Sequence, residues 1–510
     1  LKNNYFEAFN NLGTVYKILG KKNEALINLE RAISINPQYV EAHSNLGYVN
    51  TDLEKNQKAI FHFQKAIEIN NNYEKAYYGL GKLYLKIKDF NKAISYFKNA
   101  ILINSKYEEA IVSLGFTFNR VENYTEAISN FKKAIEINDN NTNTYTGIGW
   151  AFFNTGDFKK AIESYEKAIS LYPENLVSHW FLLTTFPIIY ENTKQVDEFR
   201  ESFKKNIDKI NNLLNRNFKY DKEKILNALQ TYTNFYLHYQ GKNDFELQKK
   251  YAQLVQRLTK KIYPEFFRQS NKLLDCNNLK IGFISSFLRD HSIAKTHKNW
   301  ILKLDKKIFK IFVYYLEDII FDETTNSIKK HVNYFFNGRN IKKIIQQISK
   351  DDLDIIVHLD IGMDCNSQIL GSLRLAPIQC LAMGHPVTSG FDNIDYVLSS
   401  ELMEPKNGQD HYTEQLINLP NTGQCYELPV LTNLGNQNST YKKDKIIFLI
   451  PQSLFKLLPR SDHIYIDIVK KYPKSQFWFI NGASEIITNE FKNRVMNCFK
   501  KNNLQSEKYI

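Results

Sequence analysis

The stretch FNNLGTVYKILGKKNEALINLERAISINPQYVEA, residues 9–42, decides the fold of the first third of the chain. One of its glycines and two of its alanines return every 34 residues for five consecutive periods. The recurring residues are Gly13, Gly47, Gly81, Gly115 and Gly149, then Ala25, Ala59, Ala93, Ala127 and Ala161, and finally Ala32, Ala66, Ala100, Ala134 and Ala168. A strict period of this length indicates a repeat architecture, in which each unit stacks on its neighbours.

A period of 34 residues is typical of tetratricopeptide repeats, each a pair of antiparallel helices. The pattern aromatic-x2-Leu-Gly-x2-Tyr of the first helix is met at residues 9–16 and 77–84. Small residues let the two helices approach closely, and Pro37 and Pro173 end second helices. Large side chains are expected to fill the gaps between repeats, namely Leu29, Phe63, Phe97, Phe131 and Tyr165. The sequence therefore predicts an α-solenoid of five repeats, starting at residue 6, over residues 1–175.

A stack of helical pairs presents a concave surface, and such surfaces usually hold a peptide or a partner protein. The repeats taken alone favour a scaffold protein without enzymatic activity. Whether the protein is a scaffold or an enzyme must therefore be inferred from the residues after 175.

The composition restricts the class of protein. At 510 residues the chain has room for two or three domains. No apolar run of about 18 residues occurs, so neither a membrane-spanning helix nor a membrane partner is expected. The five cysteines are scattered, which favours the reducing cytoplasm and indicates neither disulfides nor a metal site. The net charge of +13 comes without a tight Lys and Arg cluster, so nucleic acid is the weaker hypothesis for a partner.

Residues 176–278 read as a helical connector without the 34-residue period. Apolar residues recur at helical spacing in 196–214, 222–239 and 245–262, with Asp244 as the expected N-cap of the last helix. We expect the aromatic residues of this connector to belong to its core.

From residue 279 short apolar runs alternate with helical stretches, which predicts a parallel sheet covered on both faces. Residues 279–431 form the first such lobe, and the pattern restarts in residues 432–510. The expected strands are 280–285, 308–315, 332–336, 354–359, 378–382, 394–398, 446–450 and 476–480. The expected helices are 293–304, 341–349, 367–373, 461–471 and 486–501. Ligands of such sheets bind outside the carboxyl ends of the strands.

Three segments follow strands at that edge. His291 lies in the first, residues 285–292, where an imidazole could transfer a proton or contact a substrate. The second, residues 374–390, has two glycines and small hydroxyls that suit an anion or a sugar. Lys456 lies in the third, residues 451–459, within reach of a phosphate. Each segment alone is equally explained as a surface loop.

Together these segments resemble the O-linked N-acetylglucosamine transferases and SPINDLY-like proteins of glycosyltransferase family 41, in particular bacterial members. The likeness rests on the repeats and on residues 233–241, 281–292, 373–390, 395–401, 411–414 and 452–459. It implies an α/β GT-B type fold of two Rossmann-like lobes, the second of them incomplete in this chain.

The resemblance also implies an activity: inverting, metal-independent transfer of a sugar from a nucleotide sugar to Ser or Thr hydroxyls of proteins. N-acetylglucosamine from UDP-N-acetylglucosamine is the expected donor, and GDP-fucose or UDP-glucose remains an alternative. No cofactor or metal is expected. The implied catalytic residues are His291, Asp351 and Lys456. The implied substrate-binding residues are His385, Pro386, Thr388, Ser389, Gln452 and Ser453.

Two features depart from the family. Its second lobe continues beyond what matches here, so we expect this chain to be a fragment that binds the sugar nucleotide poorly and transfers little. Some members hold the acceptor with an asparagine ladder at the sixth position of each repeat. Asn11 and Asn45 keep this ladder, whereas Gly79, Ser113 and Gly147 do not. The alternative function is a repeat scaffold whose GT-B domain is degenerate.

Overall fold

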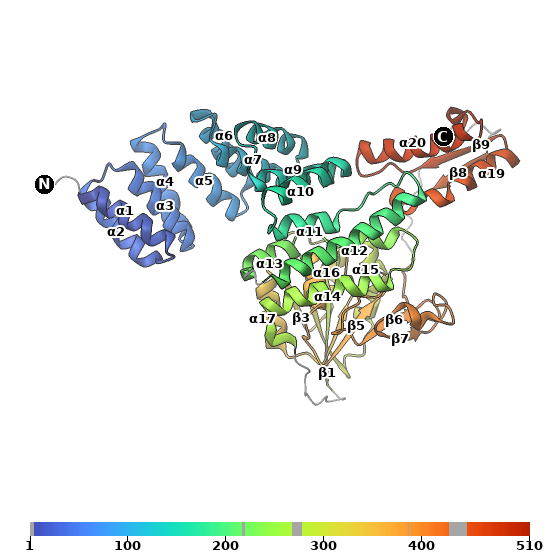
Figure 1. The fold of residues 1–510 in the computed structure, drawn as a ribbon. Helices are drawn as coiled ribbons and strands as arrows, with labels where there is room; N and C mark the ends of the chain where they lie inside the picture. The colour runs from blue at the N-terminus through green and yellow to red at the C-terminus, as the bar shows by residue number, and fades with distance from the viewer. Residues whose placement is uncertain (1–4, 217–219, 268–277, 386, 428–445, 510) are drawn as a thin grey trace. The chain divides into compact units, whose positions relative to one another are not determined.

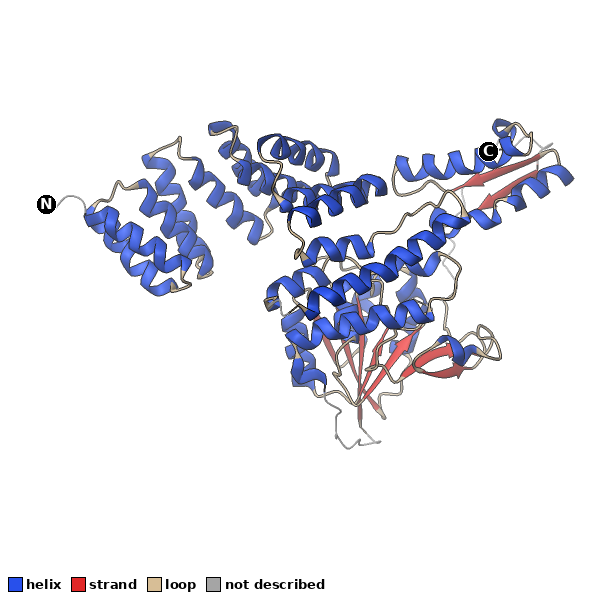
Figure 2. Cartoon of the chain, viewed as in Figure 1, coloured by secondary structure: helices blue, strands red, loops and turns tan. Residues whose placement is uncertain are grey.

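The computed structural model describes residues 5–216, 220–267, 278–385, 387–427 and 446–509 (Figure 1). The chain divides into two compact units, Leu1–Pro173 and Glu174–Ile510. Figure 2 shows that the first unit is helical and that the strands belong to the second.

The first unit is an array of five helical pairs, as the 34-residue period predicts. Its helices are α1 (Tyr5–Ile18), α2 (Lys22–Ile35), α3 (Val40–Asp52), α4 (Asn56–Ile69), α5 (Glu74–Lys86), α6 (Phe90–Ile103), α7 (Glu108–Arg120), α8 (Tyr124–Ile137), α9 (Thr142–Thr155) and α10 (Phe158–Leu171). First helices of neighbouring repeats pack on each other, and each second helix also packs on the first helix of the next repeat.

The glycines of the period are explained by close helix packing. A Cβ at Gly47 would lie 2.6 Å from the ring of Phe63, and a Cβ at Gly81 would lie 2.5 Å from that of Phe97. Both rings are completely buried. The predicted pairing of small and large residues is therefore confirmed, because a side chain at these glycines would push the helix pair apart.

The second unit begins with α11 (Leu176–Thr184), α12 (Thr193–Asn215), α13 (Lys222–Leu229), the 3-10 helix η1 (Phe235–Tyr239), α14 (Phe245–Ile262) and the 3-10 helix η2 (Pro264–Phe267). We expected one helix over 222–239, but the chain leaves the helix after Leu229. The indole of Trp180 donates to the carbonyl of Tyr232 at 3.0 Å, so this stretch is held by tertiary contacts instead. Asp244 precedes α14 without capping it, because its carboxylate binds Arg200 and His238.

A seven-stranded sheet follows, with the order β3-β2-β1-β4-β5-β6-β7, and every adjacent pair is parallel. Its strands are β1 (Leu279–Ser285), β2 (Phe309–Tyr315), β3 (Tyr334–Asn337), β4 (Ile355–His358), β5 (Ile378–Ala382), β6 (Tyr396–Ser400) and β7 (Gln415–Leu419). The order reverses direction between β1 and β4, as in doubly wound nucleotide-binding folds, and this reversal places a crevice at their carboxyl ends.

Helices cover both faces of this sheet. The connector helices α12 and α14 share one core with Ile284, Tyr314 and Ile356 of the sheet and run across it in Figure 1. The helices α17 (Ile341–Asp351) and α18 (Cys365–Gly371) join the same core. The helices α15 (Ser292–Leu302) and α16 (Glu323–His331) cover the opposite face with Phe283 and Val313. The connector is thus one layer of the α/β unit.

Two elements of the fold were not predicted from the sequence. The helix α16 buries only Thr325 and Ile328, too few residues for a recognisable apolar stripe. The edge strand β7 has mostly exposed side chains and pairs only with β6. Packing and strand pairing with neighbouring elements therefore stabilise α16 and β7, rather than a periodic pattern in their own sequences.

Residues 446–509 form a smaller α/β part. Strands β8 (Ile446–Ile450) and β9 (Ser475–Phe479) are parallel, and α19 (His463–Lys471) and α20 (Glu485–Lys501) pack on them. The predicted strand-helix-strand-helix order is confirmed here. Short 3-10 helices occur at η3 (Gly408–His411), η4 (Leu454–Lys456), η5 (Pro459–Ser461) and η6 (Ser506–Lys508).

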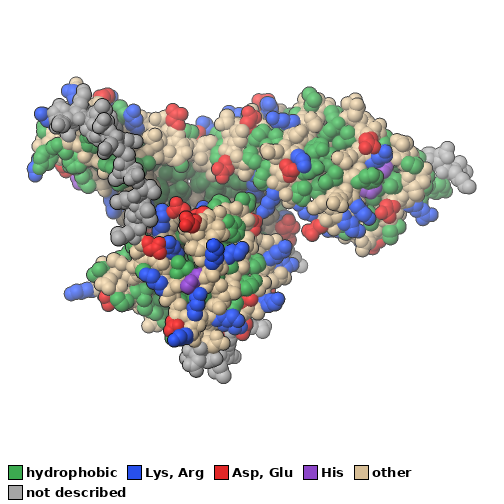
Figure 3. Space-filling view, turned by 180° about the vertical axis from the view of Figure 1, so that it is seen from behind, with side chains coloured by type: hydrophobic (Ala, Val, Ile, Leu, Met, Phe, Trp, Pro, Cys, Tyr) green, Lys and Arg blue, Asp and Glu red, His purple; other side chains and the backbone are tan. Residues whose placement is uncertain are grey.

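Two surface properties agree with the composition. Among the described residues, no helix has both the length and the apolar character that crossing a membrane requires. On the face seen in Figure 3, Lys and Arg side chains are interspersed with acidic and other residues.

Candidate functional site

Polar side chains lie at the carboxyl edge of the sheet, in the loops that follow three neighbouring strands. His291 follows β1, Asp360 follows β4, and His385 follows β5. Because β1, β4 and β5 are adjacent and parallel, these three loops lie side by side at the crevice where the strand order reverses. With strands about 4.8 Å apart, the outer two loops start about 10 Å from each other.

His291 caps the helix that follows β1. Its Nδ1 accepts a hydrogen bond from the backbone N–H of Ile293 at 3.2 Å, and its ring stacks on Phe287. Burial lowers the pKa of His291, and the nearby Arg289 and Lys295 lower it further. A neutral imidazole whose Nδ1 accepts carries its proton on Nε2. His291 is therefore arranged to donate a hydrogen bond through Nε2 rather than to remove a proton.

Asp360 is a completely buried carboxyl group between the loops of β1 and β4. Its Oδ2 accepts from the hydroxyl of Ser285 at 2.9 Å and from the N–H of Ser286 at 2.7 Å. Burial raises the pKa of Asp360 to about 7, and the negative charge of Asp364 also raises it. Within the described residues, Oδ1 has no hydrogen-bond partner. This protonatable group at the ligand edge was not predicted, although Asp360 follows a strand within two residues.

His385 follows β5 in a loop that lies close to β4. A Cβ at Gly384 would lie 1.9 Å from the carbonyl oxygen of Leu359, so only glycine fits there. His385 is 2% exposed, and burial holds its pKa well below the ordinary value, with His238 as a second cause. Among the described atoms, neither ring nitrogen has a hydrogen-bond partner. A neutral imidazole with two unsatisfied nitrogens is a group that a bound polar ligand would stabilise.

The hydroxyls of Thr388 and Ser389, predicted to bind substrate, donate hydrogen bonds to the carboxylate of Glu414. Thr388 Oγ1 donates to Glu414 at 2.7 Å, and both the N–H and the hydroxyl of Ser389 donate to the same group. All three residues are at most 3% exposed. These two hydroxyls attach the loop after β5 to Glu414, and their contact with a ligand stays a prediction. Glu414 lay in a recognised motif, but its role was not foreseen.

An aromatic cluster, defined as Phe235, Tyr236, Tyr239, His385 and Phe455, joins three parts of the second unit. Phe235 stacks on His385 at 5.2 Å between ring centroids. Phe455 meets Tyr239 edge-on at 4.8 Å and Tyr236 at 5.6 Å. The connector aromatics thus line the candidate site, in addition to any role in the core.

Lys456 extends from this cluster. Its Nζ lies 5.6 Å from the centroid of Tyr239. Gln452, Ser453 and Lys456 are all exposed, in the loop after β8. The ammonium group therefore lies beside Tyr239 of the connector and Phe455, on an exposed side chain that an anionic ligand can reach.

Asp351 does not join these residues. It is the last residue of α17, and its carbonyl accepts from the ammonium group of Lys280 near the start of β1. Its carboxylate accepts from Tyr314 at 2.6 Å and from Gln347 at 3.0 Å. Asp351 thus lies at the amino end of the sheet, before β4, and its catalytic role stays a prediction.

Pro386 lies outside the described residues. Asn11 and Asn45 lie on α1 and α3, the first helices of their repeats. Asn11 is exposed, whereas the amide of Asn45 donates to the side chains of Asn10 and Thr14. Of these two asparagines Asn11 is the exposed one, and its Oδ1 accepts from the amide of Asn10 at 3.5 Å.

The asparagine ladder ends for a steric reason. A Cβ at Gly79 would lie 2.2 Å from the ring of Phe63, and one at Gly147 would lie 2.5 Å from that of Phe131. These rings already fill the space between consecutive repeats. Asparagine at these two positions would therefore require the helices to separate.

In the parts of the chain that the structure describes, no group of three or more His, Cys, Asp or Glu residues has the geometry to hold a metal ion.

The chain is similar to known proteins in both of its parts. Residues 237–427 match glycosyl transferase family 41. Tetratricopeptide repeat families match residues 13–53, 48–88, 74–107 and 106–174.

Two curated relatives illustrate the likeness. The probable UDP-N-acetylglucosamine–peptide N-acetylglucosaminyltransferase SPINDLY of Solanum lycopersicum is 29% identical over 174 residues, which cover 32% of this chain and 18% of that protein. The similarly named probable transferase SEC of Arabidopsis thaliana is 26% identical over 215 residues, covering 40% and 22%. The chain thus spans about a fifth of the length of these relatives.

A mutant of the O-GlcNAc transferase of Thermobaculum terrenum has a similar structure, with a TM-score of 0.56 and 16% sequence identity. The alignment covers 86% of this chain and 73% of that one. At this identity the likeness shows a shared fold: helical repeats followed by a parallel α/β region.

Proposed function

This chain carries a glycosyl transferase family 41 domain behind tetratricopeptide repeats, and we propose that the protein containing it transfers a sugar from a nucleotide sugar to Ser or Thr hydroxyls of other proteins. UDP-N-acetylglucosamine is the proposed donor, because the relatives' names specify it. The acceptor oxygen forms a bond to the anomeric carbon, and the bond from that carbon to the diphosphate breaks. The configuration inverts, the nucleoside diphosphate leaves with the electron pair of the broken bond, and the proton of the hydroxyl is released to solvent.

The position of Lys456 carries this proposal. A departing diphosphate gains negative charge, and a cation aimed at that charge lowers the barrier. The Lys456 ammonium lies 5.6 Å from the centroid of Tyr239, whose ring is 6.0 Å from that of His385 in the loop after β5. We propose that it offsets the charge of the leaving group and that the reaction proceeds without a metal ion. Gln452 and Ser453, exposed in the same loop, would contact the nucleotide.

The two histidines position the reactants in this proposal. His291 donates a hydrogen bond from Nε2, because its Nδ1 is engaged by the cap of α15. His385 is neutral at any physiological pH, since burial depresses its pKa, and one of its unsatisfied nitrogens would accept from a sugar hydroxyl. Neither residue is proposed as the proton acceptor.

We further propose that the acceptor protein lies along the first helices of the repeats, where Asn11 is exposed. The described cysteines Cys365, Cys380, Cys425 and Cys498 are free thiols. Free thiols support a reducing compartment, and we propose the cytoplasm.

In the full-length protein that contains this chain, the experiment replaces Lys456 with methionine, an unbranched side chain of similar length without the charge. Release of nucleoside diphosphate and transfer to protein are measured with a panel of UDP- and GDP-sugars. We expect Lys456→Met to lower kcat by about a hundredfold to a thousandfold, the usual effect of losing one group that stabilises transition-state charge.

Lys471→Met is the matched control, because Lys471 lies at the same 5.6 Å from an aromatic ring, that of Tyr472, on α19. Its rate should stay within about twofold of the unchanged protein. Equal rates for both variants would refute the role of Lys456. If no donor is consumed while a partner still binds the repeats, the alternative of a scaffold with a degenerate transferase domain is correct.

A further inference from the structure

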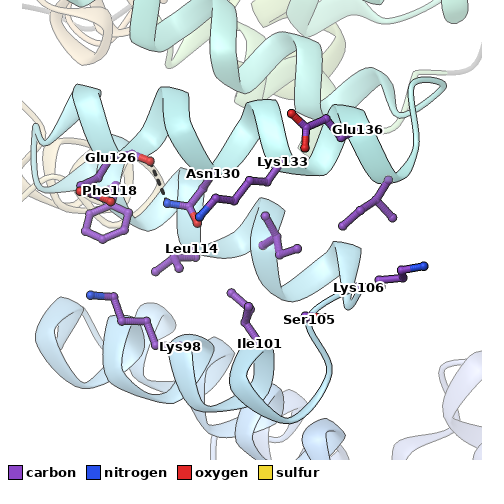
Figure 4. Close-up of a pocket in the computed structure, with 12 residues that line it drawn as sticks. Lys98, Ile101, Ser105, Lys106, Leu114, Phe118, Glu126, Asn130, Lys133 and Glu136 are labelled. Carbon is purple, nitrogen blue, oxygen red and sulfur yellow. Dashed lines mark hydrogen bonds between the residues drawn. The ribbon is translucent and has the colours of Figure 1, made fainter.

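The repeat array contains a pocket of about 460 Å³ between α6, α7 and α8 (Figure 4). Ile101 of α6, Leu114 and Phe118 of α7, and Asn130 of α8 form much of its lining. The amide of Asn130 donates to the carbonyl of Glu126 within its own helix. The pocket therefore has an apolar floor, and the amide of Asn130 is turned back to its own helix.

The preceding repeat explains why the pocket exists. There Tyr96 stacks on Tyr84 with ring centroids 5.4 Å apart and an interplanar angle of 5°. One period later the same two positions hold Asn130 and Phe118. The first helix of the later repeat still carries an aromatic ring, that of Phe118. The ring that would stack on it is replaced by the much smaller amide of Asn130. The pocket thus corresponds to the space that a stacked ring fills in the preceding repeat.

Lysines surround this space. Lys98, Lys106 and Lys133 line the pocket together with Glu126 and Glu136. The Lys98 Nζ lies 5.8 Å from the centroid of Phe118. No ion pair within the described residues involves any of the three lysines. Their charges are therefore available to an acidic ligand.

The pocket differs from the surface proposed for the acceptor. It is lined by Ile111, Leu114 and Phe118 of α7, whereas Ser113 holds the ladder position of that helix. At 3.6 residues per turn, Ser113 faces the other side of α7. The pocket opens between the second helices α6 and α8, away from the line of Asn11 and Asn45.

We propose that this pocket binds an aromatic side chain of a partner protein, on a segment that carries acidic residues beside the ring. The partner's ring takes the place on Phe118 that Tyr96 takes on Tyr84. The neighbouring carboxylates pair with Lys98 and Lys133. This docking site is independent of sugar transfer, so the proposal stands or fails separately from the proposed function.

The test titrates the full chain with a synthetic pentapeptide that has a central tyrosine between two aspartates. Asn130→Tyr restores the ring pair of the preceding repeat and should fill the pocket, lowering the affinity at least about tenfold, the effect of excluding one buried aromatic side chain. Asn130→Ser is the control, because Ser164 holds the equivalent position one repeat later. Its affinity should stay within about twofold, and circular dichroism checks that both variants fold.

A second variant tests the charges without altering the pocket. Lys98→Glu combined with Lys133→Glu exchanges exposed side chains only and should lower the affinity about tenfold. A peptide with alanine in place of tyrosine should bind at least about tenfold more weakly. Absence of binding to the unchanged chain, or undiminished binding to Asn130→Tyr, would overturn the proposal. Self-association that Asn130→Tyr abolishes would identify a second copy as the occupant and overturn it equally.

Discussion

Hydrogen bonds to single buried polar groups determine which side chains of the site are free to bind a ligand. Thr388 and Ser389 have the hydroxyls that a sugar-binding loop needs, yet both donate to Glu414. A carboxylate that is 1% exposed must be satisfied by donors, because burying it unpaired is costly. The hydroxyls of this loop thus maintain its shape, whereas both ring nitrogens of His385 are buried without a hydrogen-bond partner among the described atoms.

Asp360 makes the stability of the chain depend on pH. Its pKa rises from 3.8 to about 7 through burial, so the folded chain holds a proton that the unfolded chain releases. The stabilisation by this proton is complete below about pH 4 and is lost as the pH rises through 7. A shift of about three units corresponds to about 4 kcal/mol between the two limits.

We expect Asp360→Asn to remove this dependence. The amide can still accept from Ser285 and Ser286, so the variant should be more stable than the unchanged chain above pH 7 and similar near pH 4. Urea unfolding between pH 4 and 9 measures the difference. Asp410→Asn, at an exposed carboxylate, should leave the pH slope as it was. An unchanged slope in Asp360→Asn would contradict the assignment.

The repeats show how packing between elements limits a binding surface. Phe63 fills the space beside Gly47 of its own repeat and Gly79 of the next. The helices therefore stack closely only if the ladder position of the third repeat has no side chain. At Gly79 and Gly147 close stacking leaves no room for an asparagine side chain, whereas at Ser113 a Cβ is accommodated.

Completing the ladder should destabilise the array. We expect Gly79→Asn to lower its free energy of unfolding by about 1–3 kcal/mol, the usual cost of overpacking, because the new Cβ meets the ring of Phe63. Ser113→Asn is the control at the equivalent position of the next repeat, where a Cβ is already accommodated. Differential scanning calorimetry of both variants measures the effect. Equal stabilities would show that the helices move apart without cost.

For the whole second unit, one buried arginine connects the part after residue 446 to the connector. Arg494 of α20 donates two hydrogen bonds to Asp462, at 2.9 and 3.0 Å, and one to the carbonyl of Tyr190 at 3.1 Å. It is 8% exposed, and Ile189 packs in the same core as α20. The position of Lys456 relative to the aromatic cluster depends on this connection.

Removing the arginine should loosen that part of the molecule. Arg494→Met leaves Asp462 buried without its partner and should destabilise residues 446–509 by about 3–5 kcal/mol. Hydrogen exchange of β8 and β9 should accelerate, while exchange in β1 and β4 stays unchanged. Lys492→Met, at an exposed position of the same helix, should have no such effect. Uniform exchange rates across both variants would show that Arg494 is dispensable.

The sequence alone determined the repeat array and the parallel α/β region, and it placed residues 285–292, 384–390 and 451–459 in loops that follow strands. Local patterns of the sequence predict these features: a 34-residue period, short apolar runs and loops that directly follow strands. The elements α16 and β7 were missed because their residues show little periodicity and are held by their neighbours.

Only the tertiary structure decided which residues of those segments meet at the site. Asp360 directly follows β4, yet its complete burial and its hydrogen bonds with Ser285 and Ser286 depend on a different loop. Thr388 and His385 share a loop, yet one is bound to Glu414 and the other contacts Phe235. Direction, burial and pairing depend on residues far away in the chain, because a side chain's surroundings are set by packing between elements. The pattern of one segment holds no information about them.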